Sequence, residues 1–215
     1  GPTLLIVHGL FGSARNWGVI AKHLASCRDV IAVDLRNHGQ SPRFDTQSYP
    51  EMAADLAEVI EANGKPMDVL GHSMGGKASM QLALTRPDLI RRLIVADIAP
   101  VAYNHDQSGH IQSMRQLDLT DLTSRGEADR RLSATLSDPA LRAFFLQSLD
   151  LKAQPPEWRL NLDVLEAEMP KIVGWPATEG QFDQPSLFLT GALSHYVKPE
   201  YRDAIKAQFP KARFA

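Results

Sequence analysis

The sequence predicts an α/β fold in which a mostly parallel sheet carries helices on both faces and an inserted helical segment covers one end. Three observations support this prediction. Short apolar runs rich in Val, Ile and Leu alternate with segments of helical spacing in the first part of the chain. After Ile98 the alternation stops, and apolar residues recur at helical intervals until about Gln184. A further strand-like run then resumes the sheet.

Five apolar runs have the composition of strands that are buried on both faces. They are Thr3–Val7, Val30–Val33, Met67–Leu70, Leu93–Ala96 and Ser186–Thr190. Because segments with helical spacing separate the first four runs, neighbouring strands should be parallel.

Two helices are expected between these strands. Ser48 and Glu51 have the spacing of a capping box, in which each side chain satisfies a free amide at the start of a helix. Apolar residues at helical spacing follow until Asn63-Gly64, where glycine ends the helix. The second helix covers Lys77 to Thr85.

The inserted region is expected to be helical, with no strand. Apolar residues recur at helical intervals in Ile111–Leu122, Arg130–Leu136 and Leu141–Leu149. Turns are expected at Pro155-Pro156 and Trp175-Pro176. The chain then divides into a core (residues 1–97), a helical lid over the carboxyl ends of the strands (98–184) and a continuation of the core (185–215). The continuation is expected to end before the last strand is complete and before the loop that follows it, since Arg213-Phe214-Ala215 has the form of the start of that strand.

Composition excludes several function classes. The 215 residues carry 23 Lys and Arg against 25 Asp and Glu, a net charge of −2, and no basic run tracks a phosphate backbone, so nucleic acid is not expected as a partner. Cys27 is the only cysteine, so no disulfide within the chain is possible. No apolar run is long enough to span a membrane. We expect a cytoplasmic protein that needs no membrane, metal or cofactor, and the sequence does not indicate an oligomeric state.

The motif that carries chemistry is Gly71-His72-Ser73-Met74-Gly75, which matches G-x-S-x-G between a predicted strand and a predicted helix. A serine on so sharp a turn has strained backbone geometry, and only glycine on either side leaves room for the neighbouring chain. The turn exposes the hydroxyl at the edge of the sheet, where the start of the next helix favours negative charge. Ser73 is therefore the candidate nucleophile.

The oxyanion that forms during such a reaction needs two amide donors. The Met74 amide is one, and the Leu10 amide, in the loop after the first strand, is the other. Two neighbours in that loop, His8 and Phe11, are candidate auxiliary residues, although a histidine in this place more often braces a loop than performs chemistry.

Taken together, these segments resemble the α/β-hydrolase fold, and more narrowly the small bacterial YbfF-like esterases. The resemblance rests on HGLFGSARNW, DLRNHGQSPR, GHSMGGKA, LIVADIAPVAY and GALSHYVKPEYR. It implies hydrolysis of carboxylic esters or of acyl thioesters such as acyl-CoA.

The acid of the catalytic triad is expected at Asp97, which ends the strand after the nucleophile helix. The commoner acid position in this fold holds Ser194, and a hydroxyl cannot carry the charge that stabilises an imidazolium. Ser194 is then an auxiliary hydrogen-bond partner at most. The alternative is that Asp97 only caps the turn into the lid.

The base is expected on a loop after the final strand, and no residue of the sequence fits that place. His72 lies in the elbow itself, and His195 is the only histidine after the fifth strand. We therefore expect a sequence that is truncated at both ends, in which Ser73 is built as a nucleophile and the catalytic histidine lies beyond Ala215. Residues 1–215 alone should be nearly inactive.

Two alternatives stay open. The chain could be a binding protein on a hydrolase scaffold, although an intact elbow and oxyanion loop favour an enzyme. Another hydrolase or an acyltransferase chemistry also fits, because the fold does not fix the reaction. In each case the partner is a small molecule.

Overall fold

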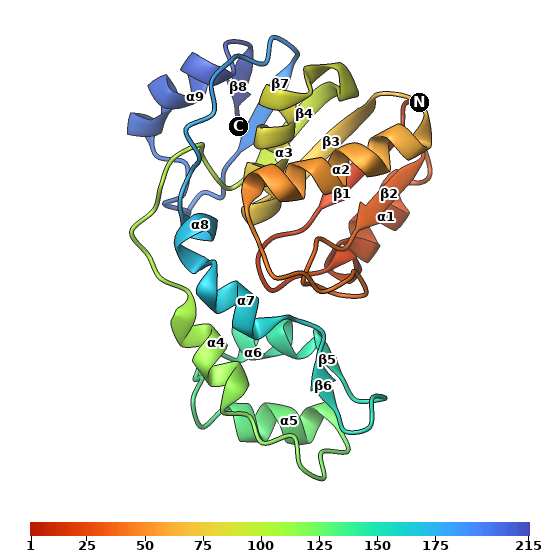
Figure 1. The fold of residues 1–215 in the computed structure, drawn as a ribbon, viewed down its shortest axis with the longest axis vertical. Helices are drawn as coiled ribbons and strands as arrows, with labels where there is room; N and C mark the ends of the chain where they lie inside the picture. The colour runs from red at the N-terminus through yellow and green to blue at the C-terminus, as the bar shows by residue number, and fades with distance from the viewer.

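The computed structural model describes all residues from Gly1 to Ala215, and six parallel strands form its main sheet in the order β2-β1-β3-β4-β7-β8 (Figure 1). Five of them confirm the predicted runs, and the sixth begins one residue before Arg213. The sixth strand therefore lies where Arg213-Phe214-Ala215 has the form of the start of a last strand. The strands are β1 (Leu4–Val7), β2 (Val30–Val33), β3 (Met67–His72), β4 (Ile90–Ala96), β7 (Ser186–Leu189) and β8 (Ala212–Phe214).

Helices cover both faces of this sheet, as predicted. Figure 1 shows α2 and α3 in front of the strands, where they pack on each other. The connection from β1 to β2 runs opposite to those that follow it, so right-handed crossovers place α1 on the other face. The helices and 3₁₀ turns of the core are η1 (Ala14–Trp17), α1 (Gly18–Leu24), α2 (Tyr49–Asn63), α3 (Met74–Thr85), η2 (Pro87–Leu89), η3 (Pro199–Tyr201) and α9 (Arg202–Gln208).

The predicted caps of α2 are confirmed. The Ser48 amide donates to Glu51 Oε2 at 3.1 Å, and the Ser48 hydroxyl donates to the same oxygen at 2.5 Å. At the other end Gly64 has φ 75°, a left-handed conformation that favours glycine. The residues at both ends therefore fix the length of the helix.

The region between β4 and β7, which we call the lid, lies beyond one end of the sheet (Figure 1). Its helices start and stop earlier than the sequence predicts, and the expectation that it contains no strand is wrong. Leu149 pairs with the buried Trp158 in a short antiparallel sheet, which is too short to show an alternating pattern. The lid elements are α4 (Ser108–Arg115), α5 (Arg125–Leu132), α6 (Pro139–Leu146), β5 (Leu149–Asp150), β6 (Glu157–Trp158), α7 (Leu162–Ala167) and α8 (Met169–Val173).

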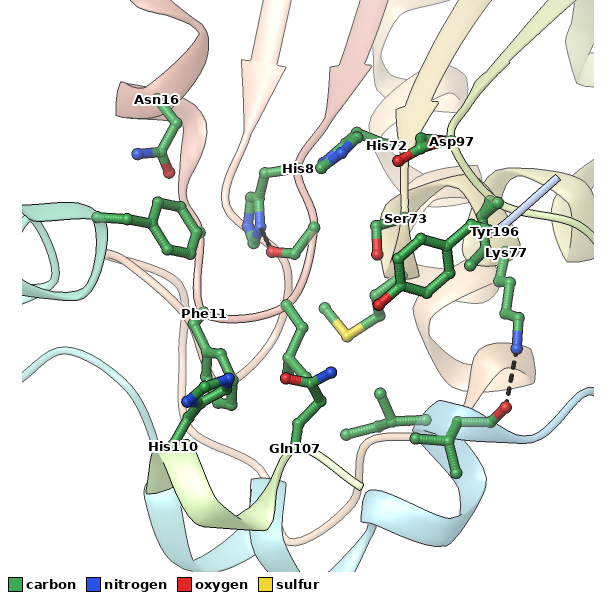
Figure 2. Close-up of a pocket in the computed structure, with 18 of the residues that line it drawn as sticks. His8, Phe11, Asn16, His72, Ser73, Lys77, Asp97, Gln107, His110 and Tyr196 are labelled. Atoms are coloured by element: carbon green, nitrogen blue, oxygen red, sulfur yellow. Dashed lines mark hydrogen bonds between the residues drawn. The ribbon is translucent and has the colours of Figure 1, made fainter. Parts of the chain in front are cut away.

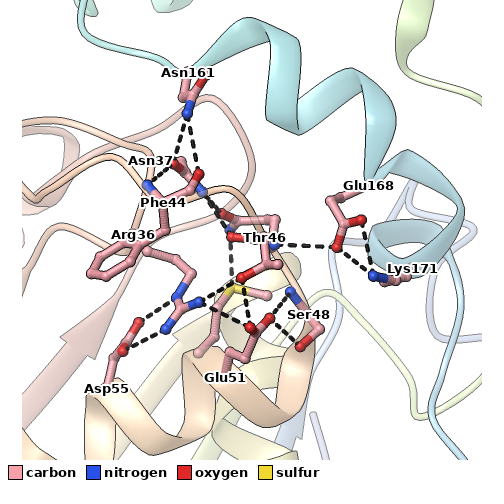
Figure 3. Close-up of polar contacts among 12 residues, drawn as sticks. Arg36, Asn37, Phe44, Thr46, Ser48, Glu51, Asp55, Asn161, Glu168 and Lys171 are labelled. Carbon is pink, nitrogen blue, oxygen red and sulfur yellow. Dashed lines mark hydrogen bonds and ion pairs between the residues drawn. The ribbon is translucent and has the colours of Figure 1, made fainter.

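Polar contacts fix the lid to the loop between β2 and α2 (Figure 3). The Asn161 amide nitrogen donates to the Asn37 carbonyl at 3.0 Å, and the two side chains are joined by a second hydrogen bond of 3.0 Å. The Gln47 amide donates to Glu168 Oε2 at 3.3 Å. The lid is thus held to the core by directed bonds as well as by apolar packing.

One hydrophobic cluster joins the core and the lid, and α3 lies at its centre with every residue from Met74 to Leu84 buried. None of the helices combines the length and the hydropathy needed to cross a bilayer.

Candidate active site

Ser73 lies on the turn between β3 and α3 and has φ 51° and ψ −120°. A residue other than glycine with positive φ is strained by about 1–3 kcal/mol, and such strain clusters at functional sites. Two backbone hydrogen bonds hold it, from the Ser73 amide to the Ala96 carbonyl (3.0 Å) and from the Lys77 amide to the Ser73 carbonyl (3.1 Å). The predicted elbow geometry is therefore present.

The glycines of the elbow are required by close approach of the backbone. A Cβ atom on Gly71 would lie 2.4 Å from the Gly75 carbonyl oxygen, and one on Gly75 would lie 2.3 Å from the His8 carbonyl oxygen. Neither backbone segment can move aside without disturbing β1 or α3. Gly71 thus lets the end of β3 pack against the start of α3, and Gly75 lets the start of α3 pack against the end of β1 and the loop after it.

A cavity of about 490 Å³ opens beside Ser73 at the carboxyl ends of the strands (Figure 2). Its size is typical of small-molecule sites. Fourteen of the 25 residues that line it are hydrophobic, and the lid contributes Leu141, Phe144 and Phe145 from α6 and His110 from α4. An apolar chain therefore fits the cavity, with its polar end at Ser73.

The expected oxyanion donors, Leu10 and Met74, both line this cavity. The Leu10 amide donates no hydrogen bond to another backbone group, and the Met74 amide opens α3, where the first amides have no partner within the helix. Gly9 brings the two segments together, since a Cβ there would lie 3.2 Å from Ser73 Cβ. Both amides are free to meet an oxyanion.

Asp97 is the second residue with unusual backbone geometry at the cavity, with φ 58°. It directly follows β4, and its amide donates to the Leu189 carbonyl at 2.8 Å. One carboxylate oxygen accepts long hydrogen bonds from the Gly191 amide (3.4 Å) and the Thr190 hydroxyl (3.5 Å). These weak contacts leave the half-buried carboxylate available to another partner.

Ser194 makes no hydrogen bond to Asp97. Its amide donates to the Gly191 carbonyl at 2.9 Å, and its hydroxyl accepts from the Tyr196 amide at 3.2 Å. The hydroxyl therefore stabilises its own turn. The next residue, His195, is exposed and lies outside the cavity lining.

His8 braces the loop after β1. Its ring nitrogens contact the Gly9 carbonyl at 2.8 Å and accept from the Leu35 amide at 2.9 Å. His38 does the same from the other side, contacting the Arg36 carbonyl at 2.9 Å and accepting from the Phe11 amide at 3.2 Å. An acceptor nitrogen on each ring requires the neutral form. Burial lowers the pKa of His8 and lowers that of His38 to about 3.

Phe11 has φ 63° and is held in this conformation by that bond to His38. Its ring packs edge-on against Phe145 of the lid, with centroids 5.4 Å apart. Phe11 therefore joins the loop after β1 to the lid.

We expect His38→Gln to destabilise the protein in a pH-dependent manner. At pH 7.5 the loss of the rigid ring, which contacts the Phe11 amide and the Arg36 carbonyl at once, should lower the free energy of unfolding by about 1–3 kcal/mol. The wild-type folded state keeps His38 neutral while the unfolded chain binds a proton below about pH 6.5, so wild-type stability falls as the pH drops and the difference between the proteins should shrink by pH 5. Urea unfolding at both pH values measures this. His23→Gln, on an exposed histidine, is the control. An equal loss of stability at both pH values would contradict the conclusion that His38 is neutral in the folded protein.

Sequence reasoning missed several residues at the cavity, above all Lys77, which is 1% exposed. It is the one charged residue in the run GGKASMQLAL, on a helix that is otherwise apolar or neutral. That isolation was the signal available. The tyrosines that surround it, Tyr49 and Tyr103, carry no comparable signal because aromatic residues are common in cores.

Comparison with known proteins agrees with this geometry. The chain is 40% identical to the esterase YbfF of Escherichia coli (98% of this chain, 82% of that protein) and 37% identical to the mouse sn-1-specific diacylglycerol lipase ABHD11 (99% and 72%). Its fold matches the solved structure of a marine microorganism esterase with a TM-score of 0.95 and 35% identity, covering 100% of this chain and 86% of that one. The sequence pattern of the alpha/beta hydrolase fold matches residues 2–215, so this chain belongs to the α/β-hydrolase fold family.

Proposed function

We propose that the protein is a serine hydrolase that cleaves carboxylic esters, and also acyl thioesters such as acyl-CoA, through an acyl-enzyme on Ser73. One observation carries this proposal: Ser73 has strained backbone geometry at the start of α3 and lines a largely apolar cavity beside the free Leu10 and Met74 amides. The esterases and lipases among its relatives support an ester bond as the bond that is cleaved.

The reaction follows from these positions. Ser73 Oγ attacks the acyl carbonyl carbon and gives its proton to a base, while the oxyanion accepts hydrogen bonds from the Leu10 and Met74 amides. The tetrahedral intermediate collapses, and the base returns the proton to the departing alcohol oxygen or thiol sulfur. Water then attacks the acyl-enzyme by the same route, releasing the carboxylic acid and restoring Ser73.

We further propose that Asp97 orients and stabilises the base, and that the base is a histidine outside residues 1–215. Six histidines of the chain have other contacts or positions: His8 and His38 brace a loop, His23 and His195 are exposed, His105 contacts the Tyr196 hydroxyl, and His110 packs on Phe11 and Phe145. His72 lines the cavity near Asp97, but it is the last residue of β3 and directly precedes Ser73, so it belongs to the elbow itself. A polypeptide of residues 1–215 alone should therefore turn over esters very slowly.

The test is steady-state hydrolysis by the natural protein of p-nitrophenyl acetate, p-nitrophenyl octanoate and octanoyl-CoA. We expect continuous turnover of both ester and thioester. Binding of the substrates without turnover would favour a binding protein on a hydrolase scaffold. A burst of p-nitrophenol that continues only when an alcohol is added would identify an acyltransferase instead.

A further inference from the structure

Lys77 is the only lysine or arginine among the buried residues, and the reaction proposed above does not use it. It lies on α3, one turn after Ser73, and it lines the cavity. A buried charge is costly unless hydrogen bonds or other charges compensate for it. The groups that surround Lys77 Nζ therefore indicate what this lysine does.

Carbonyl oxygens and aromatic faces take the place of a carboxylate. Lys77 Nζ donates to the Val173 carbonyl at 3.1 Å and to the Gly174 carbonyl at 2.5 Å (Figure 2 draws the first). The ammonium also lies 4.7 Å from the centre of the Tyr103 ring and 5.6 Å from that of Tyr49, within the range of cation–π attraction. All of these contacts join α3 to other segments.

The contacted carbonyls belong to the segment 172–174, where the lid returns toward β7. Its three consecutive carbonyls are all bound: the Tyr49 hydroxyl donates to that of Ile172, and the Tyr103 amide donates to that of Val173 at 2.9 Å. Tyr103 lies where the chain leaves β4 and enters the lid. Lys77 thus lies at the point where both connections of the lid meet the nucleophile helix.

The side chains of this returning segment form part of the cavity wall. Ile172 and Val173 both line the cavity, together with Ser73 and Tyr49. Movement of 172–174 away from α3 would widen the cavity beside the nucleophile and remove apolar surface from a bound acyl chain. The contacts of Lys77 therefore control a wall that a longer chain touches.

We propose that Lys77 is a positioning residue that holds the returning segment of the lid, 172–174, as the wall of the acyl cavity, and that it thereby sets the affinity for longer acyl chains. The kinetic part of this inference rests on the ester hydrolysis proposed above. The structural part does not, because it concerns where the lid is fixed.

We call the contacts between Lys77 and the segment 172–174 the joint. The groups around Lys77 make the stability of this joint depend on pH. Burial lowers the pKa of Lys77 from its ordinary 10.5 to about 7. The groups that face it are Tyr49 from α2 and Tyr103 and His105 from the connection after β4, while α8 offers only carbonyls. Burial raises the pKa of both tyrosines, so they are neutral here, and burial and the Lys77 charge lower the pKa of His105.

The direction of this pH dependence follows from the number of protons that the closed and the open state bind. An opened joint returns Lys77 to water and to its ordinary pKa, so between pH 7 and 10 the closed joint binds fewer protons than the open one. Raising the pH in this range therefore favours closure, because the neutral amine still donates to the Val173 and Gly174 carbonyls and no longer carries a buried charge, although it loses the cation–π attraction. In the wild type, the ratio of KM for the octanoyl ester to KM for the acetyl ester should fall between pH 7 and 9, and the ratio cancels ionisations that affect both substrates.

The variant Lys77→Met tests the proposal in the natural protein, because methionine fills similar space without a donor or a charge. KM for p-nitrophenyl octanoate should rise about 10-fold, as expected when buried carbonyls lose their donors, while kcat and KM for the acetate stay within about 2-fold. Hydrogen exchange should quicken in residues 98–107 and 170–178 but not in α3. The matched control is Lys152→Met, an exposed lysine of the lid that lies outside both segments, which should change neither measurement.

Several results would overturn the proposal. Equal losses with both esters would show that Lys77 acts on the nucleophile turn, and unchanged exchange in 98–107 and 170–178 would show that it does not fix the lid. If Lys77→Met does not fold, Lys77→Gln, which keeps a donor group in similar space, takes its place in both measurements. Tyr49→Phe adds a milder test and should raise the octanoate KM about 3-fold.

If the natural protein hydrolyses no ester, the proposed function fails, and the exchange experiment still decides the role of Lys77.

Discussion

Replacing Ser73 by alanine in the natural protein should lower kcat for ester hydrolysis by about 10⁶. Alanine keeps the backbone and the cavity but removes the only atom placed to form the acyl-enzyme. The free Leu10 and Met74 amides remain, so substrate binding should change little and the residual rate should come from the oxyanion site alone. Initial rates with p-nitrophenyl acetate, read at a series of substrate concentrations, measure both quantities.

A covalent probe identifies the nucleophile independently of turnover. A fluorophosphonate that forms a tetrahedral adduct should label the wild type on the peptide that contains Ser73, and mass spectrometry should find no adduct in Ser73→Ala. Ser133→Ala, on an exposed serine of the lid, should label as the wild type does. An adduct on another residue, or equal labelling of Ser73→Ala, would refute the assignment.

The second large effect is expected at Asp97. Asp97→Asn should lower kcat by about 10⁴, because a neutral amide does not stabilise the imidazolium and favours the wrong tautomer of the histidine. The KM should change little, since asparagine keeps the size and shape of aspartate where this residue lines the cavity. Comparison of kcat and KM for the variant and the wild type separates these effects.

Ser194→Ala is the matched comparison for Asp97→Asn, because it alters the commoner acid position of the fold. Its hydroxyl bonds only within its own turn, so a loss of less than about 10-fold is expected. A loss at Ser194 that equals or exceeds the loss at Asp97 would reverse the ranking of the two residues. Circular dichroism of both variants checks that the fold is retained.

The sheet and the nucleophile turn could be predicted because their signals are local. Each of the five predicted strands is a run of four to seven residues in the structure, and the turn needs glycine at two fixed places beside Ser73. The capping box of α2 is equally local, since Ser48 and Glu51 lie within one helical turn. In such segments the residues that determine the local conformation lie within a few positions of one another in the sequence.

The lid and the role of Lys77 depend on contacts between distant residues. The carbonyls that bind Lys77 lie 96 and 97 residues after it, and Trp158, which closes the small lid sheet, donates from its ring nitrogen to the Met114 carbonyl at 3.0 Å. Helical spacing alone predicts that α4 continues to Leu122, whereas the helix ends at Arg115. No pattern within a short window reports these partners.

The chain enters and leaves the lid through adjoining segments, since the Tyr103 amide donates to the Val173 carbonyl at 2.9 Å. Chain segments joined by a backbone hydrogen bond lie about 5 Å apart, so the helical part of the insertion begins and finishes at almost the same place. A stretch of chain with adjoining ends can be exchanged as a cassette, because the strands beneath it keep their spacing whatever its length. Genetic recombination at these two points would replace the wall against which the acyl group packs and leave Ser73 and the sheet in place. The part of the chain that sets the substrate range, the lid, is thereby separate from the part that carries out the reaction, the sheet with Ser73.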